Sequence, residues 1–418
     1  MSLDAASVSI PNASGATDRV DLPMRAFAGG YYSNLKALYD HLDIQYHSQP
    51  FLFEFAKPEA VSTGRKGSRG SSSYFVHASN LHKIPPPRPS ALGTISYLIE
   101  IVYLLACYTW FSICCFLVAP REAGYARLSE TLDQYVKRIW LPKYFVAYYL
   151  LPLISGVTTC PHEALLDFPA SDLIEYKRKT HGAPHYTVSN GVGDVQERLA
   201  KGIDCELRAT ISKVEPLEKG VRLSWIDESE EIKREEVFDR VVIAVAPDIV
   251  GRIFEPLRRH MARIPTTLVK SVVHTDRSMF CDDRIHEPSN NNEHEAQLIC
   301  LQTSTDDVRQ TESIHVQNCG AIVTTCPFSP IDPTLTICSA KFTRVLRSAE
   351  SRSIVNSIFG NTHDTFGNEK TRSLWRNGED NVWLAGGWCW DGMVLLEGCV
   401  VSATRIARDF DVDVPWLR

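Results

Sequence analysis

Several motifs that would assign a function directly are missing from this sequence of 418 residues. Its twelve cysteines form no CxxC pair and no Cys/His spacing suited to zinc, so no metal site is predicted. No HExxH, GxSxG or P-loop pattern occurs, and metal-dependent hydrolysis, serine acyl transfer and nucleotide hydrolysis lose their usual support. The net charge is −6 and no basic stripe with interleaved aromatics occurs, which argues against nucleic acid as the main partner.

The N-terminal residues also lack the marks of a secretion signal. They have no basic segment followed by an apolar one, and they are rich in Ser, Ala, Asn and Gly without a period. We therefore predict reduced, mostly buried thiols in a cytoplasmic protein, and a disordered tail over residues 1–19.

One long apolar run stands out, from Ile101 to Ala119, and it contains no charged residue. Its length and composition satisfy the requirements for a membrane-spanning helix. No second such run occurs, and the amphipathic sequence that follows indicates a helical subdomain in which this helix could be central. A helix over residues 96–119 is predicted, either in contact with a membrane or buried in the core; the first interpretation would make the cytoplasmic protein membrane-associated.

The stretch from Asn381 to Ala407 predicts a strand, a tight turn and a helix. A short apolar run meets Gly386 and Gly387, and a longer apolar run of helical length follows. Glycines allow a flat ligand to approach the backbone, and the start of a helix offers free N–H groups and a positive dipole end. The alternative interpretation is an ordinary strand-helix turn whose helix closes the core.

Two further features are weaker. Gly191-Val192-Gly193 precedes a predicted helix, but Gln196 stands where a third glycine would complete a GxGxxG pattern. Lys270 lies within an apolar strand-like run, where a lysine needs a function or a partner unless it reaches water at a strand end.

Five stretches, in this order along the chain, resemble the flavin-containing amine oxidase superfamily and, within it, a branch of FAD/NAD-binding oxidoreductases. They are VDLPMRAFAGGYYSNLKALYDHLDI from Val20, LPKYFVAYYLLPLISGVTTCPHEALLDFPA from Leu141, HYTVSNGVGDVQERLA from His185, ATISKVEPLEKGVRL through DRVVIAVAP from Ala209, and LAGGWCWDGMVLLEGCVVSA from Leu384. The resemblance covers roughly Val20 to Phe410, and the last two stretches are the most specific.

The resemblance implies an α/β, FAD-linked amine-oxidase-like fold with a discontinuous Rossmann-type FAD domain and a mixed-sheet and helical substrate domain. The FAD domain would comprise residues 20–45, 180–260 and 370–410, and the substrate domain residues 46–179 and 261–369 with the apolar helix 96–119. The cofactor would be FAD.

The resemblance also implies site residues. Gly386, Gly387 and Trp388 would lie along the isoalloxazine edge, and Glu397, Gly398 and Cys399 at the start of the closing helix, near the flavin's pyrimidine carbonyl. Val214 would give backbone contacts to the adenine. Lys270 would be the catalytic lysine that holds a water at the flavin N5.

The sequence departs from this family at its beginning. A strand, a GxGxxG turn and an acidic residue should precede Val20, and they do not. Either the chain is truncated, or its start is misassigned, or it has lost the usual mode of FAD binding. We expect an FAD-dependent oxidoreductase that abstracts a hydride from an apolar small molecule; the alternative is a catalytically silent or truncated binding protein on the same scaffold. The sequence predicts no oligomeric state.

Overall fold

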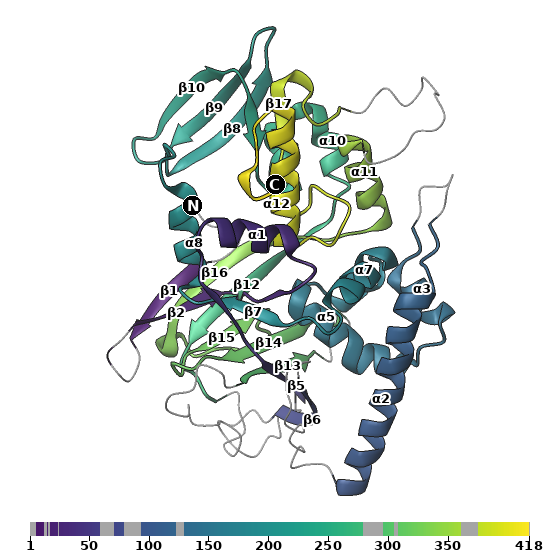
Figure 1. Ribbon diagram of the computed structural model, residues 1–418. Coiled ribbons are helices and arrows are strands. Elements are labelled where there is room, and N and C mark those ends of the chain that lie inside the picture. Colours follow the sequence, from purple (N-terminus) through teal and green to yellow (C-terminus); the bar gives the residue numbers. More distant parts are fainter. Residues whose placement is uncertain are drawn as a thin grey trace.

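The computed structural model describes residues 6–11, 15, 17–23, 25–58, 71–78, 93–122, 129–278, 296–304, 308–360 and 375–417. Within these residues a smaller sheet region lies above a larger one, and a helical region lies beside the larger sheet (Figure 1).

The smaller region combines a three-stranded antiparallel sheet with a parallel pair of strands. Its strands are β8 (Ala209–Pro216), β9 (Val221–Asp227), β10 (Ile232–Phe238), β11 (Val241–Ile243) and β17 (Val382–Leu384). Its helices are α9 (Pro247–Ile253), α10 (Arg258–Met261), α11 (Ala349–Phe359) and α12 (Leu396–Asp409). β11 and β17 pair in parallel, and β17 consists of three buried apolar residues, as is typical of strands covered on both faces.

The larger region is a seven-stranded sheet with the order β16-β12-β15-β14-β13-β5-β6. Its strands are β5 (Phe51–Pro58), β6 (Ser71–Ala78), β12 (Thr266–His274), β13 (Gln297–Thr303), β14 (Thr311–Val316), β15 (Ile322–Thr325) and β16 (Thr336–Val345). All neighbours are antiparallel except β13 and β5. The sheet therefore joins two strands from the first 80 residues with five strands from residues 266–345.

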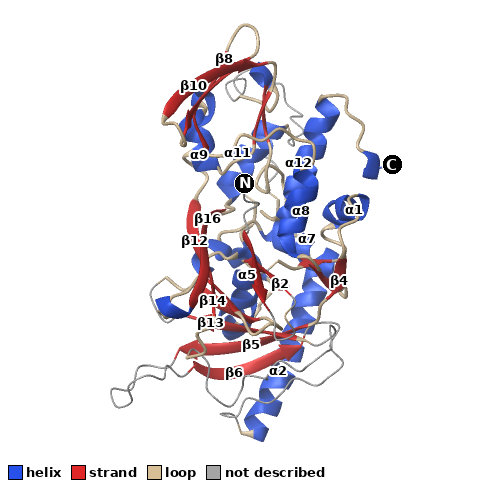
Figure 2. Ribbon diagram, turned by 90° about the vertical axis from the view of Figure 1, so that its left-hand side faces the viewer, coloured by secondary structure: helices blue, strands red, loops and turns tan. Residues whose placement is uncertain are grey.

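The helical region follows β6 in the chain and covers one side of the large sheet (Figures 1 and 2). It contains α2 (Thr94–Leu117), α3 (Leu132–Arg138), α4 (Lys143–Phe145), a π-helical turn (Val146–Leu150), α5 (Leu151–Thr158), α6 (His162–Leu166) and α7 (Ala170–Thr180). The π-helical turn lies directly before Pro152, which has no N–H to continue the regular ladder.

The structure distinguishes between the two interpretations of the apolar helix α2, membrane contact and burial in the core. It begins and ends two residues before the predicted limits, and only 28% of its most apolar 18-residue stretch is buried. One face packs against the protein through Leu104, Phe111 and Cys115, while Ile99, Val102 and other large apolar side chains are exposed. α2 is therefore not a helix enclosed by the core.

The prediction of a disordered tail over residues 1–19 is wrong for the part of it that forms strands. β1 (Ala6–Pro11) and β2 (Thr17–Leu22) pair as an antiparallel hairpin. Val8 and Ile10 pack against buried Val20 and Leu22. They alternate with serines, which is the period-two pattern of a strand. The high content of small polar residues had suggested disorder instead. Residues 1–5, 12–14 and 16 lie outside the described part of the tail.

The remaining elements join the two regions. A three-stranded sheet has the order β3-β7-β4, and two helices lie beside it. These elements are β3 (Phe27–Ala28), α1 (Ser33–His41), β4 (Tyr46–Ser48), β7 (His185–Val188) and α8 (Gly191–Ala200). Short 3-10 turns occupy Glu255–Leu257, Pro333–Leu335, Glu379–Asn381 and Pro415–Leu417.

Candidate functional site

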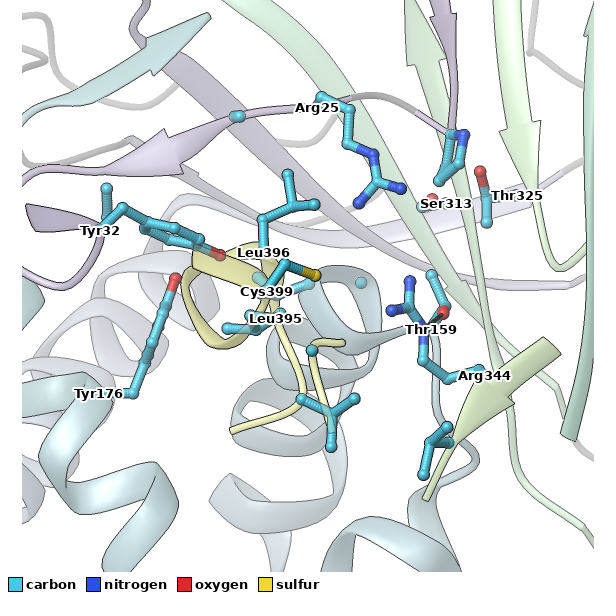
Figure 3. A pocket seen from close by; sticks show the side chains of 18 of the residues that line it. Arg25, Tyr32, Thr159, Tyr176, Ser313, Thr325, Arg344, Leu395, Leu396 and Cys399 are labelled. Atoms are coloured by element: carbon cyan, nitrogen blue, oxygen red, sulfur yellow. Dashed lines mark hydrogen bonds between the residues drawn. The ribbon is translucent and has the colours of Figure 1, made fainter. Parts of the chain in front are cut away.

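A cavity of about 470 Å³ lies between the two sheet regions. The connection from β17 to α12 forms one wall, the inner face of the large sheet forms another, and α5 contributes a third. Figure 3 shows side chains from these elements pointing into the same space. Its volume lies within the range of small-molecule and cofactor sites.

The wall formed by the β17–α12 connection depends on its two glycines. Gly386 has a φ of +149°, which disfavours other residues, and its N–H donates to Ser402 Oγ at 3.0 Å. A Cβ on Gly387 would lie 2.9 Å from the carbonyl oxygen of Leu395. Trp388 Nε1 donates to the carbonyl of Val245 at 3.1 Å, which fixes the turn to the loop after β11. The wall is thus rigid and close-packed.

The N-terminus of α12 opens onto this cavity. No side chain caps Leu395, the N-cap residue, and Leu395, Leu396 and Cys399 all line the cavity. The first N–H groups of a helix lack intrahelical partners and carry the positive end of the helix dipole. This end of the cavity therefore favours an electron-rich or anionic group.

Two arginines supply the charge in the cavity. Arg25, from the segment before β3, and Arg344, near the end of β16, both line it, and their guanidinium groups point into it (Figure 3). Arg344 donates from Nε to Thr159 Oγ1 at 2.9 Å. Among the residues that the structure describes, no Asp or Glu lines the cavity. Its electrostatic character is accordingly positive.

The histidines and tyrosines that line the cavity are neutral near pH 7. Burial lowers the pKa of His315 to about 3, and its ring nitrogens lie 2.7 Å from Gln297 Oε1 and 2.8 Å from Gln317 Nε2. Burial also lowers the pKa of His185. For Tyr176 burial raises the pKa to about 12, and for Tyr32 it raises the pKa well above the ordinary value. The arginines are thus the charged side chains that face a ligand.

Four of the residues predicted to bind the cofactor line this cavity. They are Gly386, Gly387, Trp388 and Cys399. Gly398 lies behind them, because a Cβ there would be 2.4 Å from Trp390 Nε1. The structure thus brings the turn and the helix start together, as the sequence indicated.

Glu397 has a different set of contacts. Its carboxylate is 2% exposed and accepts hydrogen bonds from the N–H of Asn34 (3.0 Å), the side-chain amide of Asn34 (2.6 Å) and the N–H of Leu35 (3.0 Å). These N–H groups belong to the first turn of α1, whose own N-cap residue Tyr32 makes no side-chain cap. Glu397 therefore caps α1 from a neighbouring helix and does not face the cavity.

Val214 and Lys270 lie away from the cavity. Val214 is buried on β8 and packs with Val221 and Val250 in the core of the smaller region. Lys270 is exposed and lies opposite Lys341, whereas its neighbour Ser271 is buried and contacts Thr325, which lines the cavity. Since adjacent strand residues point to opposite faces, the ammonium group of Lys270 points away from the cavity, not into it as expected.

The GxG segment at the start of α8 already has its free N–H bonded by the protein. Asp21 Oδ1 accepts the N–H of Val192 at 3.0 Å, and a Cβ on Gly191 would lie 2.8 Å from that oxygen. Burial raises the pKa of Asp21, while its hydrogen bonds to Ser7 and Val192 act in the opposite direction. The N-terminus of α8 is therefore closed to a phosphate.

Sequence reasoning missed the polar residues of the sheet wall and both arginines. Arg25 was within a stretch already compared with a flavin-binding family, but nothing local marked it. Arg344 had a signal, since it is a charged residue at an inward position of an alternating strand. Among the described residues, no group of three or more His, Cys, Asp or Glu could hold a metal ion.

Comparison with known proteins identifies the fold. No protein-family model matches the chain, and no curated protein sequence matches it. Its structure is similar to that of cyclohexylamine oxidase from Brevibacterium oxydans IH-35A, with 12% identity and a TM-score of 0.53, over 97% of this chain and 91% of that one. It is also similar to a fatty acid isomerase from P. acnes that produces CLA, with 12% identity and a TM-score of 0.56, over 97% of this chain and 89% of that one. The chain therefore has the amine-oxidase-like fold that its sequence indicated.

Proposed function

We propose that this protein is an FAD-dependent oxidoreductase that abstracts a hydride from an apolar small molecule. The observation that carries the proposal is the cavity, in which the Gly386-Gly387 turn and the uncapped start of α12 face a mostly apolar wall. Apolar side chains from β5, β13 and α5 make up much of that wall. The fold shared with two enzymes, an amine oxidase and a fatty acid isomerase, supports the same assignment.

The flavin end of FAD fits the residues present. Gly386 and Gly387 leave the backbone accessible to a flat ring, and the α12 N–H groups suit an electron-rich carbonyl. The phosphate end has no matching cradle among the described residues, because Asp21 fills the turn at Gly191, the only GxG in the sequence. Gly386, Gly387, Trp388 and Cys399 are thus the residues that we assign to the cofactor.

The chain's own groups would hold and orient the reactants. FAD, when bound, would supply the hydride acceptor. The start of α12 would stabilise negative charge that develops beside it, because its dipole is fixed before the reaction. The apolar walls would exclude water, and the neutral His185 and His315 would add no competing charge.

A substitution in the cavity wall tests the assignment. Cys399→Trp would place an indole beside the start of α12, where the flavin should lie. We expect FAD affinity, measured by quenching of flavin fluorescence, to fall about tenfold or more. Cys205→Trp is the matched control, since Cys205 is exposed and does not line the cavity. Equal FAD affinities for both variants and the unchanged protein would contradict the assignment. If none of the three proteins took up FAD, the result would favour the catalytically silent binding protein.

We also propose that α2 contacts a membrane surface. Its only charged residue, Glu100, is turned toward the protein and accepts hydrogen bonds from Tyr144 and Tyr149. Its other face carries a row of exposed apolar side chains, which are Ile95, Leu98, Ile99, Val102, Leu105, Ile113, Phe116 and Leu117. In Figure 1 the helix projects from the lower edge of the molecule. A helix with one face packed on protein and one apolar face fits the surface of a bilayer better than a span surrounded by lipid.

Vesicle flotation tests the membrane contact. Val102 and Leu105 are 67% and 63% exposed, and replacing both by Asp should abolish flotation with phosphatidylcholine vesicles. Leu268→Asp provides a control of similar exposure, 66%, on the outer face of the large sheet. If the unchanged protein stays in the soluble fraction, or if the double variant floats as well as the control, the contact is disproved.

A further inference from the structure

Arg344 is a buried cation with little to neutralise it. Arg344 is only 8% exposed. Within the described chain its side chain makes one hydrogen bond, to the neutral hydroxyl of Thr159. No carboxylate of the described residues lies within 4.0 Å of its guanidinium. A guanidinium stays charged at neutral pH and has five N–H donors, so most of its binding capacity remains for the cavity.

The geometry around Arg344 is fixed in advance. Thr159 has a left-handed backbone conformation, with φ of +58°, at the end of α5. Its hydroxyl donates to the carbonyl of Thr158 at 2.7 Å, which leaves its oxygen lone pairs for the Nε of Arg344. The guanidinium is also 5.3 Å from the ring centroid of Phe342. With Nε held by Thr159, the terminal nitrogens point into the cavity (Figure 3).

The charge of the cavity as a whole selects against a cationic ligand. Arg25 and Arg344 both line it, and no Asp or Glu of the described part of the chain does. Arg25 already has an electrostatic partner, because its charge acts against the rise that burial causes in the pKa of the Asp21 carboxyl. Arg344 is therefore the cation that has capacity for a ligand. An ammonium group in this cavity would meet positive charge and find no carboxylate.

The remainder of the wall is suited to hydrocarbon. Leu153 and Val157 on α5 and Ile299 and Leu301 on β13 line the same cavity, and Phe53 adds an aromatic side chain. An apolar body with one anionic end would match this distribution of groups.

We propose that the cavity binds an apolar carboxylic acid whose carboxylate pairs with the guanidinium of Arg344. A guanidinium matches the planar carboxylate with two parallel hydrogen bonds. This inference rests on the proposed function, since it names the substrate class of that site. Arg344 and Thr159 would be the groups that set specificity, and Thr159 would act by orienting Arg344.

Calorimetric titration with three ligands of equal chain length tests the inference. Decanoate, decanol and decylamine share one apolar tail and differ in the charge of the head group. We expect decanoate to bind about tenfold or more tightly than the other two, because only a carboxylate pairs with Arg344. Arg344→Gln should remove this preference and leave decanol binding unchanged. Arg344→Lys should keep part of the preference, because lysine retains the positive charge but lacks the two parallel N–H donors of a guanidinium.

The controls separate this inference from others. Arg252→Gln, at an exposed arginine, should behave like the unchanged protein. If the unchanged protein binds decylamine as tightly as decanoate, or more tightly, the inference is overturned. This comparison needs no variant, so it does not depend on whether the variants fold. Decyl phosphate binding more tightly than decanoate overturns the choice of a carboxylate.

The FAD measurement distinguishes the two proposals. Titrations before and after incubation with FAD show whether decanoate preference and FAD uptake occur together. Preference for decanoate without FAD uptake would reject the oxidoreductase and retain the carboxylate site. FAD uptake without the preference would reject the carboxylate site alone. If Arg344→Gln weakened FAD and left decanoate unchanged, the guanidinium would belong to the cofactor, and the inference would fail.

Discussion

Arg344 and Arg347 lie three positions apart in the chain, and both are buried, yet their surroundings differ completely. Arg347 is 2% exposed, and its Nη2 donates to the carbonyls of Trp390 at 2.8 Å and Gly392 at 3.0 Å. Its Nε also lies 3.8 Å from Asp172. Arg344 has one hydroxyl partner and a cavity in front of it.

The difference shows how a buried charge can be assigned a role. Arg347 is neutralised by Asp172 and by the carbonyls of the β17–α12 connection, so it holds that connection in place. Arg344 is left with donors that the described protein does not use, so its charge is available to a ligand. Burial alone does not separate the two cases, whereas the set of partners does.

The largest expected effect comes from Arg347→Met. The change leaves the Asp172 carboxylate buried without this cation and removes the bonds to the connection. We expect the free energy of unfolding to fall by about 3–5 kcal/mol. Urea denaturation would measure it. A loss below about 1 kcal/mol would contradict the structural role of Arg347.

The pH dependence of stability sharpens the role of Asp172. Burial, partly offset by Arg347 and Arg352, raises the pKa of Asp172 from its ordinary 3.8 to about 6. The folded protein therefore holds a proton that the unfolded chain has lost, and stability should fall as pH rises from about 4 to about 6, by about 3 kcal/mol. Asp172→Asn cannot titrate, so its unfolding free energy should lack this decline. Parallel curves for the two proteins would show that Asp172 is ionised throughout.

Glu397→Ala extends the comparison to a buried anion. The variant leaves the N–H groups of Asn34 and Leu35 without their acceptor, and we expect a loss of about 2 kcal/mol. Because both carboxylate oxygens bind α1, affinity for FAD should not change. A large loss of FAD affinity without destabilisation would instead restore the role that the sequence suggested for Glu397.

The smallest expected effect on stability comes from Arg344→Met. The variant loses one hydrogen bond to Thr159 and no ion pair, so the free energy of unfolding should change by less than about 1 kcal/mol. Urea denaturation under the conditions used for Arg347→Met makes the two values comparable. Destabilisation equal to that of Arg347→Met would mean that Arg344 is structural as well.

The sequence predicted the parts of the fold that depend on local pattern. The strand β17, the turn at Gly386 and the helix α12 follow from a short apolar run, a glycine pair and a helical period. The helix α2 was placed within two residues at each end. The hairpin of β1 and β2 was missed because its strands contain many small polar residues.

The site was predicted less completely, because its chemistry depends on contacts between distant segments. Glu397 carries the right charge at the right helix end, but only the position of α1 shows that its oxygens are occupied. Lys270 has the right neighbours in sequence, and strand register turns it to the outer face. Arg344 stands at an inward position of an alternating strand, but its place in front of a cavity without lining carboxylates follows from the described residues of the structure alone.

The most direct test of the central claim is FAD retention by the unchanged protein. The protein is incubated with FAD, passed through a desalting column, and its visible absorption spectrum is recorded. We predict a flavin spectrum at one FAD per chain, because the Gly386-Gly387 wall and the start of α12 form a rigid site for the flavin ring. A colourless protein would contradict the proposed oxidoreductase.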